Sequence, residues 1–152
     1  MFKTNILISA CLLGSNCRYD GKSKYYQGIE ALKEKYNLIP VCPEVLGGLS
    51  IPRIPSEIIN GKVINKEGID NTIAFLKGAN KALDLYYENN CAFAILKESS
   101  PSCGLNLIYD GSFSGKKVKG MGITALHFIK NGIKVYTEDD IEMICDGGLD
   151  EE

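Results

Sequence analysis

The chain has 152 residues, of which 45% are hydrophobic and 24% charged, and its formal net charge is −2. This length suffices for one domain with its own core, and the composition indicates neither disorder nor low complexity. A near-neutral charge without a basic run argues against a nucleic-acid partner, and no stretch approaches the roughly 20 apolar residues of a membrane span. We expect a cytoplasmic protein whose six cysteines are ligands, nucleophiles or buried residues rather than disulfides.

The first part of the chain predicts two strands joined through a short helix. Residues 4–9 form an apolar run that ends at Ala10-Cys11. Helical spacing over 29–36 and a second apolar run over 38–41 follow. The next segment, 42–57, carries three prolines and two adjacent glycines, so it is not one regular element throughout. A long loop with this apolar content is typical of a functional loop.

The second part predicts two more strands and two longer helices. The longest helix covers 69–89 and has one apolar stripe at spacings of three and four. The stripe consists of Ile69, Ile73, Leu76, Ala79, Leu83 and Tyr87. A strand over 91–96, a small hairpin with arms at 105–109 and 117–119, a helix over 121–130 and a strand over 133–136 come next. A last short helix begins at Thr137, which is its predicted N-cap.

This alternation predicts an α/β fold, a three-layer Rossmann- or flavodoxin-like parallel sheet with helices on both faces. We expect one domain over residues 1–147 and a short acidic tail over 148–152. In such sheets, ligands bind beyond the carboxyl ends of the strands. Cys11, Cys42 and Cys103 follow the first three predicted strands, so the fold would bring three thiols to the same edge.

Three thiols at one edge have several interpretations. Structural zinc sites favour close Cys-x-x-Cys pairs, and the chain has none; the ferredoxin-type cysteine run is also absent. Widely spaced cysteines suit a larger cofactor that bridges loops. A four-iron cluster on three thiolates would keep one iron without a protein ligand. Spacing alone leaves a shared metal site, or three unrelated thiols, open.

Five segments, taken together and in order, resemble one family. They are Ser9-Ala-Cys-Leu-Leu-Gly14, Cys17-Arg-Tyr-Asp-Gly21, Val41-Cys-Pro-Glu-Val45 with Gly47-Gly48, Pro52-Arg53 with Pro55, and Ser100-Pro-Ser-Cys-Gly104. The resemblance extends to Gly111-Ser-Phe-Ser-Gly115 and Gly120-Met-Gly122 and so covers nearly the whole chain. The sequence is similar to a bacterial domain-of-unknown-function family that includes the 2-thiouracil desulfidases.

The resemblance implies a [4Fe–4S] cluster bound by Cys11, Cys42 and Cys103. It further implies a non-redox reaction in which sulfur leaves a thiolated heterocycle of the thiouracil kind as hydrosulfide. Glu44 resembles the general base that activates water, and Ser100 resembles the second catalytic group, a proton or hydrogen-bond donor.

Arg18 and Arg53 are candidates for contact with the anionic cluster or a pyrimidine oxygen, because a planar guanidinium suits both. Cys17 is either a further ligand or a loop residue. Glu98 is either a second acid or the partner of Lys97 in a surface ion pair. The sequence does not predict the oligomeric state.

Other cysteines and the single histidine favour structural roles. Cys91 precedes its strand and should lie at the opposite edge of the sheet, and Cys145 falls in the final helix. His127 lies on a helix that nothing directs toward the strand edge. Two alternative functions remain: a non-enzymatic carrier of metal or sulfide, and a thiol-redox protein that uses Cys11 and Cys17.

Overall fold

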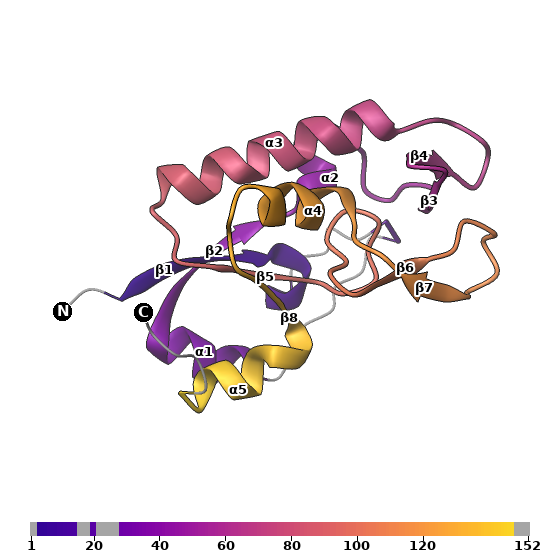
Figure 1. The fold of residues 1–152 in the computed structure, drawn as a ribbon. Coiled ribbons are helices and arrows are strands. Elements are labelled where there is room, and N and C mark those ends of the chain that lie inside the picture. The colour runs from indigo at the N-terminus through magenta and orange to yellow at the C-terminus, as the bar shows by residue number, and fades with distance from the viewer. Residues whose placement is uncertain (1–2, 15–18, 21–27, 148–152) are drawn as a thin grey trace.

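A four-stranded parallel sheet forms the centre of the computed structural model, which describes residues 3–14, 19–20 and 28–147 (Figure 1). In sheet order, the strands are β2 (Tyr36–Val41), β1 (Thr4–Ser9), β5 (Ala94–Leu96) and β8 (Val135–Thr137). All three neighbouring pairs are parallel. The order places β1 between β2 and β5, so the direction of the crossovers reverses at β1, which is where α/β sheets open a crevice for ligands. The four predicted strands are confirmed.

Helices cover both faces of the sheet, which confirms the predicted three-layer α/β class. Figure 1 shows α1 (Ile29–Lys35) and α5 (Ile141–Cys145) on one face and α2 (Pro43–Leu46), α3 (Thr72–Glu88) and α4 (Ile123–Lys130) on the other. Side chains alternate along β1 accordingly. Ile6 and Ile8 pack with α1 and α5 in one buried cluster, whereas Leu7 belongs to the cluster on the α3 and α4 side.

The stripe predicted for the longest helix is only in part the face that packs against the core: Ala79 and Leu83 contact it and the other four residues do not. The buried residues of α3 are Phe75, Gly78, Ala79, Ala82 and Tyr86. Of the predicted stripe only Ala79 is fully buried, and Ile69, Ile73, Leu76 and Tyr87 are exposed. The reason is close approach: a Cβ at Gly78 would lie 1.9 Å from the carbonyl oxygen of Pro43, so only the small-residue face fits against α2.

Two hairpins and two 3-10 turns complete the chain. The expected hairpin is present as β6 (Leu107–Tyr109) and β7 (Lys117–Lys119). A second hairpin, β3 (Ser56–Ile59) with β4 (Lys62–Asn65), and the short helix α2 lie in or after the segment expected to be a loop. The 3-10 turns are Ala10–Leu13 and Glu138–Asp140, the latter with the predicted Thr137 cap. Among the described residues, no helix is long and apolar enough to cross a membrane.

Candidate active site

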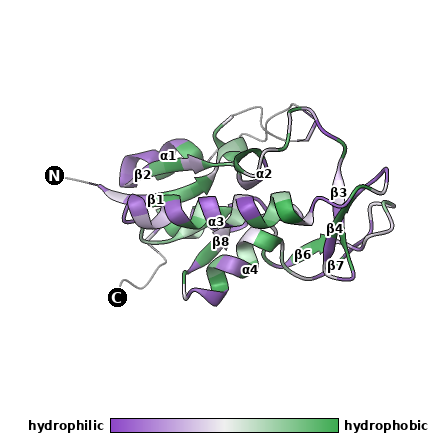
Figure 2. Cartoon of the chain, turned by 90° about the horizontal axis from the view of Figure 1, so that it is seen from above, coloured by the Kyte–Doolittle hydropathy of each residue, from purple (hydrophilic) through white to green (hydrophobic). Residues whose placement is uncertain are grey.

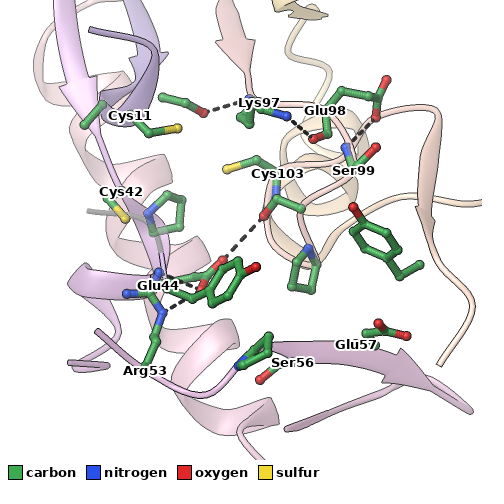
Figure 3. A pocket seen from close by; sticks show the side chains of 18 of the residues that line it. Cys11, Cys42, Glu44, Arg53, Ser56, Glu57, Lys97, Glu98, Ser99 and Cys103 are labelled. Atoms are coloured by element: carbon green, nitrogen blue, oxygen red, sulfur yellow. Dashed lines mark hydrogen bonds and ion pairs between the residues drawn. The ribbon is translucent and has the colours of Figure 1, made fainter. Parts of the chain in front are cut away.

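A cavity of about 370 Å³ lies at the carboxyl edge of the sheet (Figure 3). Its walls come from the ends of β1, β2 and β5, from α2, and from the two hairpins. The lining includes Ser9, Cys11, Tyr19, Cys42, Glu44, Arg53, Glu57, Lys66, Lys97, Glu98, Ser100, Cys103, Tyr109 and Phe113. This volume lies within the range of small-molecule sites in proteins.

The three predicted thiols all face this cavity. Cys11 lies in the 3-10 turn after β1, Cys42 directly follows β2, and Cys103 lies in the loop after β5. Residues Ser9 and Val41 pair in register at the ends of β1 and β2, so Cys11 and Cys42 leave the sheet side by side. Figure 3 shows the three sulfur atoms bordering the same open space. Cys11 and Cys103 are buried, and Cys42 is half-buried.

Hydrogen bonds that involve backbone amides hold the loop that carries Cys103. The hydroxyl oxygen of Ser100 accepts hydrogen bonds from the amides of Ser102 (3.0 Å) and Cys103 (3.1 Å). The carbonyl of Ser102 accepts from the amide of Thr124 (2.8 Å) at the start of α4. A Cβ at Gly122 would lie 2.5 Å from that carbonyl, so glycine permits the close approach of loop and helix. The thiol therefore has a fixed position.

Glu98 organises the same loop from the other side. Its carboxylate accepts hydrogen bonds from the amides of Ser99 (3.1 Å), Leu105 (2.8 Å) and Asn106 (3.0 Å), and from the Asn106 side chain (2.8 Å). Burial alone would raise the pKa of Glu98, but the hydrogen bonds outweigh it and lower that pKa. Of the two alternatives for Glu98, the ion pair with Lys97 is not formed, because Lys97 pairs with Glu138 at 3.2 Å. Glu98 is thus an anchor for the loop.

Burial raises the pKa of the Cys103 thiol to about 12, although a hydrogen bond with Ser9 offsets part of the effect. The nearby sulfur of Cys42 and carboxylate of Glu44 raise it further. A thiolate at this position would be stabilised by a nearby positive charge, such as that of a metal ion. Among the described residues, no three Cys, His, Asp or Glu side chains are close enough to share a single ion. The donor set fits a cofactor that contacts each thiol through a different atom.

Glu44 forms the acidic part of the cavity. Its Oε1 atom accepts hydrogen bonds from Nε of Arg53 at 2.8 Å and lies 2.8 Å from Nη2 of the same guanidinium. The two side chains are only 16% and 9% exposed. Its Oε2 atom faces the Ser100 hydroxyl at 3.4 Å. Because Ser100 accepts two amide hydrogens, its own hydrogen is available to donate toward Glu44 or a substrate atom.

Cys91, Cys145 and His127 lie away from the cavity, as predicted. Cys91 is buried in the core at the amino end of β5, where burial raises its pKa to about 11, and Cys145 ends α5. His127 lies on α4 and does not line the cavity. Cys17 and Arg18 lie outside the described residues.

Sequence reasoning missed Glu57, a buried acid that lines the cavity. Its carboxylate accepts hydrogen bonds from the amides of Gly111 (2.8 Å) and Phe113 (3.1 Å), and so ties the loop between β6 and β7 to β3. These hydrogen bonds hold the loop beside the cavity, and Tyr109 and Phe113 from β6 and this loop form part of the cavity lining. The Gly- and Ser-rich segment 111–115 was the only sequence signal for this wall.

Comparison with known proteins identifies the family. The model of the 2-thiouracil desulfurase family matches residues 6–140, nearly the whole described chain. The chain belongs to the 2-thiouracil desulfurase family. It is 41% identical over 149 residues to the uncharacterized protein YbbK of Bacillus subtilis (strain 168), covering 91% of this chain and 99% of that protein.

A solved structure gives the same result for the fold. It is described as TudS, a [4Fe-4S]-dependent thiouracil desulfidase, and it has a TM-score of 0.88 and 41% identity to this chain. The similarity covers 95% of this chain and 97% of TudS. The family predicted from the sequence motifs is thereby confirmed.

Proposed function

We propose that this member of the 2-thiouracil desulfurase family is an iron–sulfur enzyme that hydrolyses the C–S bond of a small thiolated heterocycle. In the net reaction, the thiocarbonyl compound and water give the corresponding carbonyl compound, hydrosulfide and a proton, and no atom changes oxidation state. The observation that carries this proposal is the meeting of Cys11, Cys42 and Cys103 with Glu44 and Ser100 in one cavity.

The three thiols are the proposed ligands of a [4Fe–4S] cluster. They come from three strand ends, and the buried Cys103 needs a positive partner to ionise. Held by these three cysteines, the cluster would supply Lewis-acid chemistry at an iron without a protein ligand, which would polarise the C–S bond of a thiocarbonyl group. The same cavity gives room for a small ring beside the thiols.

Glu44 and Ser100 provide the proposed proton chemistry. Arg53 fixes Oε1 of Glu44, which leaves Oε2 directed into the cavity to take a proton from water. Ser100 donates its remaining hydrogen to the leaving sulfur or to a ring atom of the substrate. Arg53 contributes by orienting Glu44, and as a planar guanidinium that lines the cavity it is a candidate for contact with a carbonyl oxygen of the substrate.

The test compares anaerobically reconstituted wild type with Glu44→Gln, using 2-thiouracil and 4-thiouracil as substrates. Wild type should release uracil and hydrosulfide in equal amounts. Glu44→Gln should keep its iron and visible spectrum but lose activity by about 10²- to 10⁴-fold, the usual contribution of a general base. Glu34→Gln, an exposed change on α1, is the matched control. Full turnover by Glu44→Gln would refute the role of Glu44.

The same preparations separate the alternatives. A protein that binds iron and sulfide but turns over neither compound would be a carrier rather than a desulfidase. Cys17→Val tests the ligand set, and unchanged iron content is expected. A reversible disulfide between Cys11 and Cys17 in metal-free wild type, without iron uptake, would favour the thiol-redox function.

A further inference from the structure

Glu57 is a buried acid of the cavity wall that the proposed reaction does not use. It belongs to β3, and Figures 1 and 2 show the hairpin β3–β4 beside the hairpin β6–β7 at one end of the molecule. Glu57 is 8% exposed, lines the cavity and forms no ion pair within the described part of the chain. Burying a carboxylate without polar partners is costly, so the partners of this one define its role.

The two oxygens of this carboxylate have different surroundings. Oε1 accepts hydrogen bonds from the amides of Gly111 at 2.8 Å and Phe113 at 3.1 Å. Oε2 has no hydrogen-bond partner among the described residues, yet it is not enclosed by protein. Since Glu57 lines the cavity and is otherwise buried, Oε2 is an acceptor open to this space. A carboxylate donates no hydrogen bond, so a ligand must supply an N–H or O–H group.

Two aromatic side chains share this wall. Phe113 and Tyr109 are half-buried and line the cavity. Phe113 has a φ of 58°, in the left-handed region that bulky residues rarely adopt. Glu57 holds its amide, and a Cβ at Gly111 would lie 2.9 Å from Cγ1 of Ile59, so the loop packs closely on β3. Backbone conformations of this kind cluster at ligand-binding sites, and aromatic side chains suit a planar ring.

The wall lies on the far side of the cavity from two of the thiols. Figure 3 shows Glu57 across the open space from Cys11 and Cys42. In a thiolated lactam ring such as 2-thiouracil, the carbon that carries sulfur is bonded to ring nitrogens that carry hydrogen. A ring whose sulfur points to the thiols therefore keeps N–H donors for the other walls of the cavity.

We propose that Oε2 of Glu57 accepts a hydrogen bond from a ring N–H of the bound heterocycle, and that Phe113 packs on the face of the ring. Glu57 thereby selects rings that carry an N–H donor. This inference rests on the proposed function and names a specificity-determining residue for it. A ring without the N–H leaves the carboxylate oxygen unpaired, which should weaken binding by about 10- to 100-fold.

Calorimetric titration of the anaerobically reconstituted full chain with uracil and with 1,3-dimethyluracil tests the inference. Neither ligand contains sulfur, and the second carries a methyl group on each ring nitrogen. Glu57→Gln keeps an oxygen for the amides of Gly111 and Phe113 and replaces the open oxygen by an amino group, which is a donor. This variant should reduce the preference for uracil by about 10- to 100-fold. Any clash of the methyl groups is common to both proteins and cancels in the comparison.

Two further variants complete the titrations. Glu67→Gln removes the same charge from an exposed residue that does not line the cavity, and it should retain the wild-type preference. Phe113→Leu should weaken the binding of both ligands alike, by about two- to tenfold, because ring packing does not depend on the N–H. An equal preference for uracil in wild type and Glu57→Gln would overturn the role of Glu57. Wild-type affinities in Phe113→Leu would overturn the role of Phe113.

Turnover of 2-thiouracil separates this inference from the proposed reaction. Glu57→Gln should raise KM by about 10- to 100-fold, far more than it lowers kcat, whereas Glu44→Gln should lower kcat. Desulfuration by wild type with an unchanged KM in Glu57→Gln would overturn the inference and leave the proposed reaction intact. Glu57-dependent binding of uracil without release of hydrosulfide would support the ring contact and refute the reaction.

Discussion

The ion pair between Glu44 and Arg53 should contribute far more to stability than an ordinary surface pair. Two guanidinium nitrogens lie 2.8 Å from one carboxylate oxygen, and the side chains are only 9% and 16% exposed. Exposed pairs contribute about 0–1 kcal/mol, whereas breaking a buried pair costs about 3–5 kcal/mol. Because most of the surface of both side chains is buried, we expect the coupling free energy between Glu44 and Arg53 to lie between these values, at about 2–3 kcal/mol.

A double-mutant cycle measures this coupling. The free energies of unfolding of metal-free wild type, Arg53→Met, Glu44→Ala and the double variant are obtained from denaturant titrations. Arg53 also donates a hydrogen bond to the Ser50 carbonyl. The free energy of that bond cancels in the cycle, because Arg53→Met removes it both from wild type and from Glu44→Ala. Turnover of reconstituted protein tests the orienting role separately: if Arg53 acts through Glu44, Arg53→Met should reduce the turnover of wild type but should not reduce that of Glu44→Gln further.

The chain contains a matched control pair. Lys33 and Glu30 lie 3.7 Å apart on α1, with side chains 52% and 70% exposed. Their cycle should give about 0–0.5 kcal/mol. Equal coupling in the two cycles would refute the argument that burial at the cavity strengthens the Glu44–Arg53 pair.

Two further predictions concern the loop that carries Cys103. The lowered pKa of Glu98 stabilises the folded state above the ordinary carboxyl pKa of about 4.3, and this contribution is lost as the pH falls through the folded value. Metal-free wild type should therefore be more stable than Glu98→Gln at pH 7, and the difference should shrink below about pH 4; a pH-independent difference would contradict this. Gly122→Ala should lower the free energy of unfolding by about 1–3 kcal/mol, because the new Cβ would lie 2.5 Å from the Ser102 carbonyl, and an unchanged denaturant midpoint would show that the loop yields freely.

The sheet and the meeting of the three thiols could be predicted because they depend on local signals. Apolar runs mark the strands, and parallel strands share a carboxyl edge, so Cys11, Cys42 and Cys103 could be expected at the same edge of the sheet. The loops themselves could not be predicted. Glu98 and Arg53 look like surface charges in the sequence, and only the folded chain shows that they hold a backbone loop and a carboxylate.

The side of α3 that faces the core does not follow from the predicted apolar stripe, for a physical reason. The helix carries two apolar faces, and periodicity does not say which one meets the sheet. The face with Gly78 and Ala79 packs inward because its small residues allow α2 to approach, while the larger Ile73 and Leu76 remain outside. Steric fit between helices decided the outcome, and sequence spacing carries no information about it.

The central claim is that Cys11, Cys42 and Cys103 hold a four-iron cluster. Iron and acid-labile sulfide, measured per chain after anaerobic purification and reconstitution, test it most directly. Wild type and the control Cys91→Ala, altered in the core away from the cavity, should each bind about four irons and four sulfides, and Cys103→Ala should lose them. Wild-type protein without iron, or Cys103→Ala with a full complement, would contradict the account.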